Sequence, residues 1–112
     1  MTHPNKIKGN TAERAVVQYL RENGYPFAER MRSGWSDDRG DIDNVPLTCV
    51  EVKAEKRIDL AGYMVELERE MKNAKAETGV VIVKKRGTSD VAQWYACAPV
   101  HIWIQLLKES GR

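Results

Sequence analysis

Residues 40–53 read GDIDNVPLTCVEVK, and this stretch decides the fold expected for the rest of the chain. Its second half, residues 47–54, has the alternating, β-branched character of a strand. Successive strand side chains point to opposite faces, so Glu51 and Lys53 share one face about 7 Å apart. The other face is small and apolar, and it is suited to packing beneath a helix. An acid and an amine in an otherwise apolar strand are costly to bury unless they are paired, liganded or functional.

Another acid, Asp41, lies ten residues before Glu51 and directly follows Gly40, where a turn could return the chain as an antiparallel neighbour. Asp41 and Glu51 could then hold one divalent ion, because hard cations such as Mg²⁺ favour carboxylate and water oxygens. Hydrolysis of a phosphodiester also needs a base or an orienting cation, and Lys53 could supply either. Alternatively, Asp41 caps a turn while Glu51 and Lys53 form a surface pair on an edge strand. The spacing alone leaves both interpretations open.

Composition and charge are those of an ordinary globular protein. At 112 residues, with 42% apolar and 30% charged residues, the chain is expected to form one domain with one core. No apolar run approaches the length of a membrane span, and the first residues lack the apolar segment of a signal peptide. We therefore expect a cytoplasmic protein with no membrane partner. Cys49 and Cys97 lack metal-finger spacing and are expected to be reduced core residues.

Hydrophobic periodicity and turn residues predict helices and strands in the order αβββαββα. This order is typical of an α/β layer structure with a mixed sheet of about five strands. Residues 1–9 are expected to be a flexible basic arm, and residues 10–112 a single domain. The expected helices span residues 10–23, 60–77 and 101–108. The expected strands span residues 25–32, 41–45, 47–54, 80–85 and 91–98.

The ends and faces of the first two helices are also predicted. Asn10 and Glu13 are placed as a capping box, in which Glu13 caps the helix and complements its dipole. Asp59 is the expected N-cap of the second helix and Gly79 its stop. The apolar stripe of this second helix, expected in the core, comprises Leu60, Met64, Leu67, Met71 and Ala74. Its expected solvated face comprises Glu66, Glu68, Arg69, Glu70 and Lys72.

A polar loop over residues 33–40 follows the first expected strand and could bind nucleic acid. Basic and hydroxyl side chains contact phosphate, and an aromatic ring can stack on a base. The strand and loop together supply Arg30, Arg32, Ser33, Trp35, Ser36 and Arg39. Alternatively, this is a surface loop whose Trp35 folds back onto the core. Because the net charge is only +2, nucleic-acid binding would depend on such local clusters, and others are Lys6/Lys8, Lys53/Lys56/Arg57 and Lys84-Lys85-Arg86.

With this order of elements, the chain resembles the PD-(D/E)XK nuclease superfamily over roughly residues 8–98. The motifs are Glu13 on the first helix, Asp41 after Gly40, and the Glu51-Val52-Lys53 triplet on a strand. Within the superfamily, the chain is most similar to the small Holliday-junction resolvases of archaea and related bacteriophage proteins. One departure is Gly40, which replaces the proline that names the superfamily.

The resemblance implies a restriction-endonuclease-like three-layer fold and roles for particular residues. The expected catalytic residues are Glu13, Asp41, Glu51 and Lys53. Of these, Glu13, Asp41 and Glu51 would bind Mg²⁺, for which Mn²⁺ could substitute, and no small-molecule cofactor is expected. Arg14 would contact DNA phosphate, while Arg30 and either Ser33 or Ser36 match the basic strand and serine-containing loop of those enzymes. The full set expected to contact DNA is Lys8, Arg14, Arg30, Arg32, Ser33, Ser36, Arg39, Lys56 and Arg57.

The implied activity is that of a Mg²⁺-dependent, structure-selective DNA endonuclease, a hydrolase of the Holliday-junction resolvase type. Its partner would be branched DNA during recombination or repair in a bacterial or phage-infected cell. Resolution needs two symmetric cuts, so a homodimer is expected, with the Met-bearing second helix, Trp94, Tyr95 and Trp103 as interface residues or, alternatively, core residues. Two other functions stay open, namely a general repair or recombination nuclease of this fold and a DNA-binding module that does not cleave.

Overall fold

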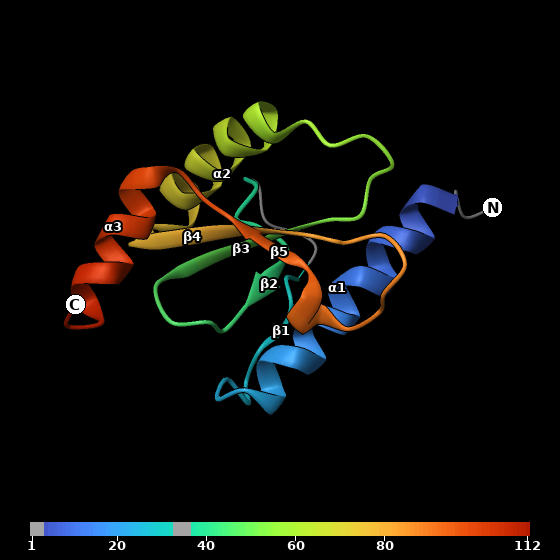
Figure 1. Cartoon of the computed structure of the whole chain (residues 1–112), viewed down its shortest axis with the longest axis horizontal. Coiled ribbons are helices and arrows are strands. Elements are labelled where there is room, and N and C mark those ends of the chain that lie inside the picture. Colours follow the sequence, from blue (N-terminus) through green and yellow to red (C-terminus); the bar gives the residue numbers. More distant parts are fainter. Residues whose placement is uncertain (1–3, 33–36) are drawn as a thin grey trace.

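The centre of the fold is a mixed β-sheet, seen in a computed structural model that describes residues 4–32 and 37–112, with side chains from Lys8 onward (Figure 1). Within these residues, five strands follow one another in the order β1-β2-β3-β4-β5. Only β3 and β4 are parallel, and every other neighbouring pair is antiparallel. The strands are β1 (Glu29–Arg30), β2 (Ile42–Asp43), β3 (Thr48–Lys53), β4 (Thr78–Val83) and β5 (Tyr95–Cys97).

Two helices cover opposite faces of this sheet, and a third follows the last strand (Figure 1). They are α1 (Pro4–Glu22), α2 (Leu60–Ala74) and α3 (Val100–Glu109), with a short 3-10 turn, η1 (Val91–Gln93), before β5. The predicted α/β class and the order αβββαββα are confirmed, as is the mixed five-stranded sheet. None of the described helices is long and apolar enough to cross a membrane.

The alternation expected in β3 is present, and it creates a separate core on each face of the sheet. Val50 and Val52 join the cluster under α1, whose other buried members are Ala12, Val16, Val17, Ala28, Ile42 and Trp94. Cys49 faces α2 in a second cluster, whose other buried members are Tyr63, Leu67, Val81 and Val83. Glu51 shares the α2 face with Cys49. As predicted, Cys49 and Cys97 are both free, although Cys97 is only partly buried.

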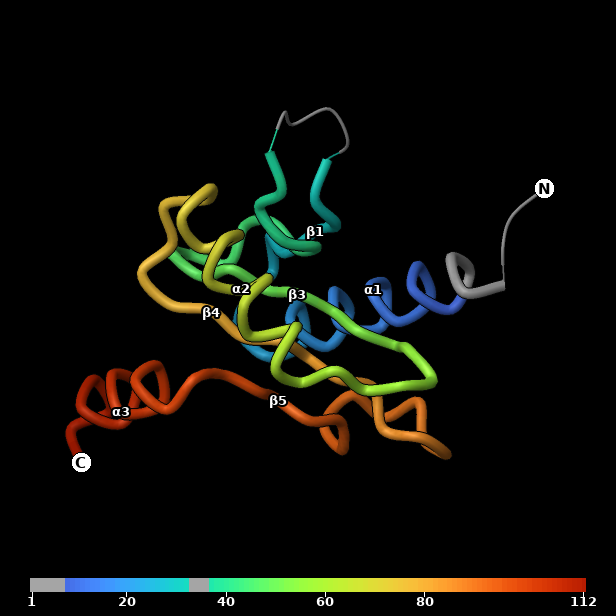
Figure 2. The backbone as a smooth tube through the Cα atoms, turned by 90° about the horizontal axis from the view of Figure 1, so that it is seen from above, coloured from blue at the N-terminus to red at the C-terminus, as the bar shows by residue number. Residues whose placement is uncertain are grey.

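The parallel pair β3–β4 requires a crossover, which α2 provides. Seen from above, α2 lies across β3 and β4 (Figure 2). The predicted N-cap is confirmed, since the Asp59 side chain accepts a hydrogen bond from the Gly62 amide. The predicted end is wrong, because the helix stops at Ala74 with Lys75 in the left-handed region at φ 53°. Gly79 is therefore not the stop but a buried residue of β4.

The expected start of the first helix is also wrong. α1 begins at Pro4, so residues 4–9 are helical rather than a flexible arm, while residues 1–3 lie outside the described residues. Proline is well tolerated in the first turn of a helix, where its missing N–H would have no partner. Asn10 and Glu13 consequently lie inside the helix and form no capping box. Their side chains accept hydrogen bonds from Arg30 instead.

The outer strands are shorter than predicted. The expected strand over residues 25–32 contains a turn, closed by a hydrogen bond from the Ala28 amide to the Tyr25 carbonyl, so that β1 has two residues. The expected strand over residues 91–98 begins with the 3-10 turn η1. α3 lies at the opposite end of the molecule from the start of α1 in both views (Figures 1 and 2). In α3 only Ile102 is buried, whereas Trp103 is 58% exposed.

Candidate active site

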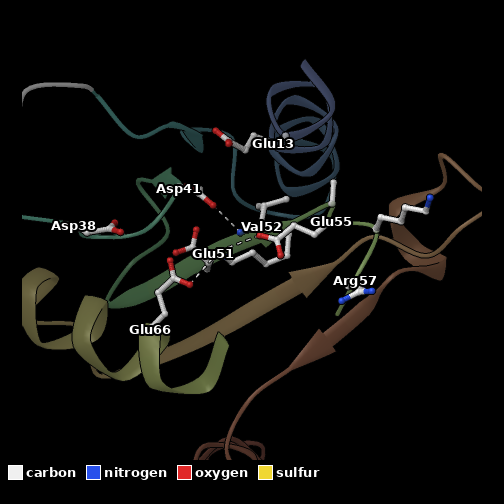
Figure 3. Close-up of a pocket in the computed structure, with 12 residues that line it drawn as sticks. Glu13, Asp38, Asp41, Glu51, Val52, Glu55, Arg57 and Glu66 are labelled. Carbon is white, nitrogen blue, oxygen red and sulfur yellow. Dashed lines mark hydrogen bonds and ion pairs between the residues drawn. The ribbon is translucent and has the colours of Figure 1, made fainter. Parts of the chain in front are cut away.

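An open cleft of about 700 Å³ lies beside β3, and the four predicted catalytic residues all line it (Figure 3). Glu13 comes from α1, Asp41 from the turn before β2, and Glu51 and Lys53 from β3. The fold therefore brings together side chains from three separate segments of the chain. The other lining residues are Gly9, Asp38, Val52, Ala54, Glu55, Lys56, Arg57 and Glu66.

Asp41 is held by the backbone of β3. Its amide donates to the Val50 carbonyl at 2.9 Å, and its Oδ2 atom accepts from the Val52 amide at 2.8 Å. Gly40, just before it, has φ 98°, which proline cannot adopt. The conformation of this turn therefore excludes proline at residue 40.

Glu51 is the buried acid of the cleft, with only 4% of its surface exposed. Its Oε2 atom has no hydrogen-bond partner among the described residues. Burial raises the pKa of Glu51 far above its usual range, and the neighbouring Asp41 and Glu70 side chains raise it further. Figure 3 shows its carboxyl group between those of Asp41 and Glu66. Burial therefore disfavours the charged form of this carboxyl group.

Two acids of α2, Glu66 and Glu70, also reach this site, which corrects their predicted place on a solvated face. Glu70 is fully buried and Glu66 is partly buried. Burial raises the pKa of Glu70 to about 7; Asp38 and Glu66 add to this shift, and a hydrogen bond with Glu51 opposes it. One carboxylate oxygen from each of Asp38, Glu51, Glu66 and Glu70 lies within 4.8 Å of the others. This cluster could bind a metal ion.

The spacing of the two α2 acids along the sequence could have predicted that they lie on the buried side of the helix. Glu66 lies three residues after Tyr63, and Glu70 lies three residues after Leu67. Both Tyr63 and Leu67 are buried, and residues three apart on a helix are neighbours on its surface. The two acids therefore extend the buried face rather than oppose it. Asp38 gave a weaker signal, because an acid in a polar loop is ordinary.

Lys53 points into the cleft with 15% of its side chain exposed. Its Nζ atom lies 3.0 Å from Glu66 Oε2, 3.9 Å from Glu55 Oε1 and 5.2 Å from the centre of the Tyr63 ring. Burial lowers the pKa of Lys53, but the surrounding carboxylates of Glu66, Glu51 and Glu55 outweigh it, so that the pKa is raised. Lys53 is consequently a fixed cation and not a general base at neutral pH.

Glu13 is oriented by a basic residue of β1. Arg30 Nε donates to Glu13 Oε1 at 3.1 Å, and its Nη2 atom donates to Asn10 Oδ1 at 2.8 Å. Burial and the charge of Asp41 raise the pKa of Glu13, and Arg30 partly opposes this. Arg30 thus positions a site acid in this structure, whereas the sequence predicted a phosphate contact.

The residues expected to contact DNA lie in different parts of the structure. Lys56 and Arg57 line the cleft, and Lys8, Arg14 and Arg32 are exposed. Arg39 lies elsewhere, where it pairs with Asp37 at 2.9 Å and lines a separate hollow beside Phe27 and Pro46. Ser33 and Ser36, together with Trp35, lie outside the described residues.

The donor set of the cluster of Asp38, Glu51, Glu66 and Glu70 fits a hard divalent cation, and of the three predicted metal ligands only Glu51 belongs to it. Its donors are carboxylate oxygens, which Mg²⁺, Mn²⁺ and Ca²⁺ prefer over softer ligands. Two carboxylate oxygens of these residues, Glu51 Oε2 and Glu70 Oε1, are buried without a hydrogen-bond partner among the described residues. Comparison with known proteins found no family model, no curated protein and no solved structure that matches the chain.

Proposed function

We propose that this protein is a Mg²⁺-dependent, structure-selective DNA endonuclease of the Holliday-junction resolvase type, with a restriction-endonuclease-like fold. The observation that carries the proposal is the meeting of Glu13, Asp41, Glu51 and Lys53 in one open cleft. Three carboxylates beside one ammonium group suit phosphodiester hydrolysis, in which charge develops on the phosphate oxygens. The order αβββαββα and the mixed sheet support the same proposal.

In this mechanism Glu13, Asp41 and Glu51 would hold the cation. When bound, Mg²⁺ supplies Lewis-acid stabilisation of the phosphate and lowers the pKa of water. The Lys53 ammonium group neutralises charge that develops on the non-bridging phosphate oxygens. The oxygen of water forms the new bond to phosphorus, the bond to the 3′ oxygen breaks, and a proton is transferred to that oxygen. The products are 5′-phosphate and 3′-hydroxyl ends.

The basic residues beside the cleft would bind the DNA backbone. Lys56 and Arg57 line the cleft directly after β3. Arg86 Nη2 approaches the Lys56 carbonyl at 3.4 Å, which brings the exposed basic turn at residues 84–86 next to them. Phosphate contacts of this kind position a duplex without reading its sequence. A nuclease that selects DNA by shape needs this type of contact.

The test is incubation of the purified protein with a labelled four-way junction and with a matched linear duplex, in Mg²⁺ and in EDTA. Paired, symmetric nicks on the junction alone, and only with metal, are the expected result. Cutting of both substrates would indicate a general nuclease that uses the same active site. Tight binding without cutting in Mg²⁺ or Mn²⁺ would instead favour a DNA-binding module.

The variant Asp41→Ala is expected to reduce cutting at least about a hundredfold while leaving junction binding largely intact, since Asp41 serves the reaction and carries no positive charge. Asp43→Ala is the matched control, because Asp43 is the next acid along the chain but lines the separate hollow beside Phe27. Cleavage rates and binding by gel shift measure both effects. An active Asp41→Ala protein would exclude the proposed metal site.

A further inference from the structure

We infer that Asp38, Glu51, Glu66 and Glu70 form a divalent-cation site of their own on the α2 face of β3, and that Glu51 is shared with the Glu13–Asp41 side of the cleft. This site deepens the proposed function: it rests on that function for its role in DNA cleavage, whereas cation binding itself can be tested without DNA. The ligand expected is a hard divalent cation, namely Mg²⁺, Mn²⁺ or Ca²⁺.

The first observation is a pair of buried oxygens that lack partners. Glu51 is 4% exposed and Glu70 is 0% exposed, and Glu51 Oε2 and Glu70 Oε1 make no hydrogen bond within the described part of the chain. Leaving buried carboxyl oxygens unpaired is unfavourable, so such groups are normally paired or bound to metal. A cation between them would satisfy both oxygens at once.

The spacing of the four acids suits one ion. Their ligand oxygens lie within 4.8 Å of one another. Opposite ligands stand about 4 Å apart around Mg²⁺ and about 5 Å apart around Ca²⁺, from metal–oxygen distances of about 2.1 and about 2.4 Å. The cluster therefore needs only small side-chain movements to close around a cation of this class.

Neighbouring groups contact two of the four acids, Glu70 and Asp38. Cys49 Sγ lies 4.0 Å from Glu70 Oε2, which leaves the other oxygen, Oε1, without a partner among the described residues. Asp38 Oδ1 accepts from the Gly40 amide at 3.1 Å, and the Asp38 carbonyl accepts from Asn73 Nδ2 at 2.6 Å. The second of these bonds ties the segment before β2 to the C-terminal half of α2. Asp38 is thus fixed beside the α2 acids by contacts that do not involve a ligand.

Lys53 contributes positive charge beside the cluster, with its ammonium group 3.0 Å from Glu66 Oε2. Arg30 lies on the other side of the cleft, where it pairs with Glu13. In Figure 3 Asp41 and Glu66 approach Glu51 from opposite sides, which is the arrangement expected of a carboxylate shared by two positions.

The test is direct cation binding by the full chain, freed of metal with EDTA. Mn²⁺ titration followed by electron paramagnetic resonance, and Ca²⁺ titration by calorimetry, measure affinity and stoichiometry without DNA. Glu70→Gln and Glu66→Gln are expected to weaken binding at this site at least about tenfold. Glu68→Gln, a change on the same helix at a side chain that is 61% exposed, is the matched control and should behave as wild type. Glu13→Gln should retain the binding that Glu70→Gln removes.

Thermal unfolding gives a second readout that also checks folding. Glu70→Gln replaces a buried acid by a neutral group of the same size, so its Tm in EDTA should equal or exceed that of wild type. Mg²⁺ should raise the Tm of wild type and Glu68→Gln but raise that of Glu70→Gln much less, because only a bound ligand stabilises by mass action. Asp38→Asn, at an exposed residue, repeats the comparison should a buried variant aggregate.

The outcomes separate this inference from the proposed function. Cation titrations and Tm shifts that are the same in wild type, Glu70→Gln, Glu66→Gln and Asp38→Asn would overturn the inference, even if the wild type cleaves junctions. Loss of binding in these variants would support it, even if no DNA substrate is cut. A wild-type protein that binds no divalent cation would overturn both.

Discussion

The backbone of Gly40 leaves no room for a side chain at the residue that precedes Asp41. Its φ is 98°, and an added Cβ would lie 3.0 Å from Cys49 Sγ and 3.1 Å from the Val50 carbonyl oxygen. Both the left-handed conformation and the close approach therefore require glycine. The position of the Asp41 carboxylate depends on a neighbour that has no side chain of its own.

Gly40→Ala is accordingly expected to lower the free energy of unfolding by about 1–3 kcal/mol, from backbone strain plus steric overlap. Gly24→Ala is the matched control, because Gly24 has φ 101° but nothing within 4 Å of an added Cβ, and it should cost only about 1 kcal/mol. Urea unfolding measures both. Equal losses at the two glycines would show that the close approach to β3 contributes nothing.

Glu70 gives the protein an expected dependence of stability on pH. Its pKa is raised by burial to about 7 from an ordinary value of 4.5, so between these values the folded state holds a proton that the unfolded state has lost. In EDTA, this group should make stability fall as the pH rises from about 5 to above 7, by about 1–3 kcal/mol. Urea unfolding across this range measures the fall, and Glu70→Gln should make it smaller without removing it, because the raised pKa of Glu51 acts in the same direction. An unchanged slope in the variant would assign the effect to other groups.

At the scale of the element, α2 shows what the sequence pattern could and could not predict. Its N-cap and its amphipathic character followed from Asp59 and from the apolar spacing. Its buried residues are Tyr63, Leu67 and Glu70, so the buried stripe includes an acid that the pattern placed in solvent. A glutamate in a helix is normally solvated, and only the acids on β3 and in the loop before it make this one different.

The strands also differ in how well the sequence pattern predicted them. β3 was predicted from local alternation and β4 from a continuous β-branched run. Both strands are present, although β4 spans Thr78–Val83 and not residues 80–85. The outer strands β1 and β5 are short because turns at residues 25–28 and 91–93 use part of each expected strand. Such turns depend on packing against α1 and the sheet, which a local pattern does not contain.

Gly79 decides how closely α2 packs on β4. A Cβ there would lie 2.8 Å from Met71 Sδ and 3.0 Å from Leu67 Cδ1. Gly79→Ala should therefore destabilise the protein by about 1–3 kcal/mol. Combined with Met71→Ala, which removes the closest atom, it should cost less than the sum of the two single changes. Urea unfolding of this double-mutant cycle measures the coupling, and strict additivity would contradict the proposed contact.

At the scale of the whole molecule, the proposed resolvase needs a symmetric dimer, and α3 offers a surface for it. Trp103 is 58% exposed and Leu106 is 44% exposed on α3, and Tyr95 is 49% exposed on the edge strand β5. Trp94, also expected at an interface, is instead 8% exposed in the core under α1. We expect the exposed apolar residues of α3 to contact a second copy.

Trp103→Glu is expected to convert this dimer to a monomer while changing the Tm of the monomer little, since the side chain is not part of the core. Light scattering coupled to size-exclusion chromatography measures the mass. Phe27→Glu is the control, because Phe27 is 79% exposed but lies beside the hollow at the β1 end of the sheet. A wild-type protein that is monomeric at all concentrations would contradict the dimer.

The contact between Asp41 and β3 has a further consequence. Asp41 Oδ2 accepts the Val52 amide at 2.8 Å, so a side-chain oxygen takes the place of a backbone carbonyl beside the strand. Any ion that draws electron density from this carboxylate also weakens its bond to the strand. Val52 lies between Glu51 and Lys53, at the centre of the cleft. The spectroscopic signal of its backbone amide should therefore change when an ion binds in the cleft, although the Val52 side chain itself binds nothing.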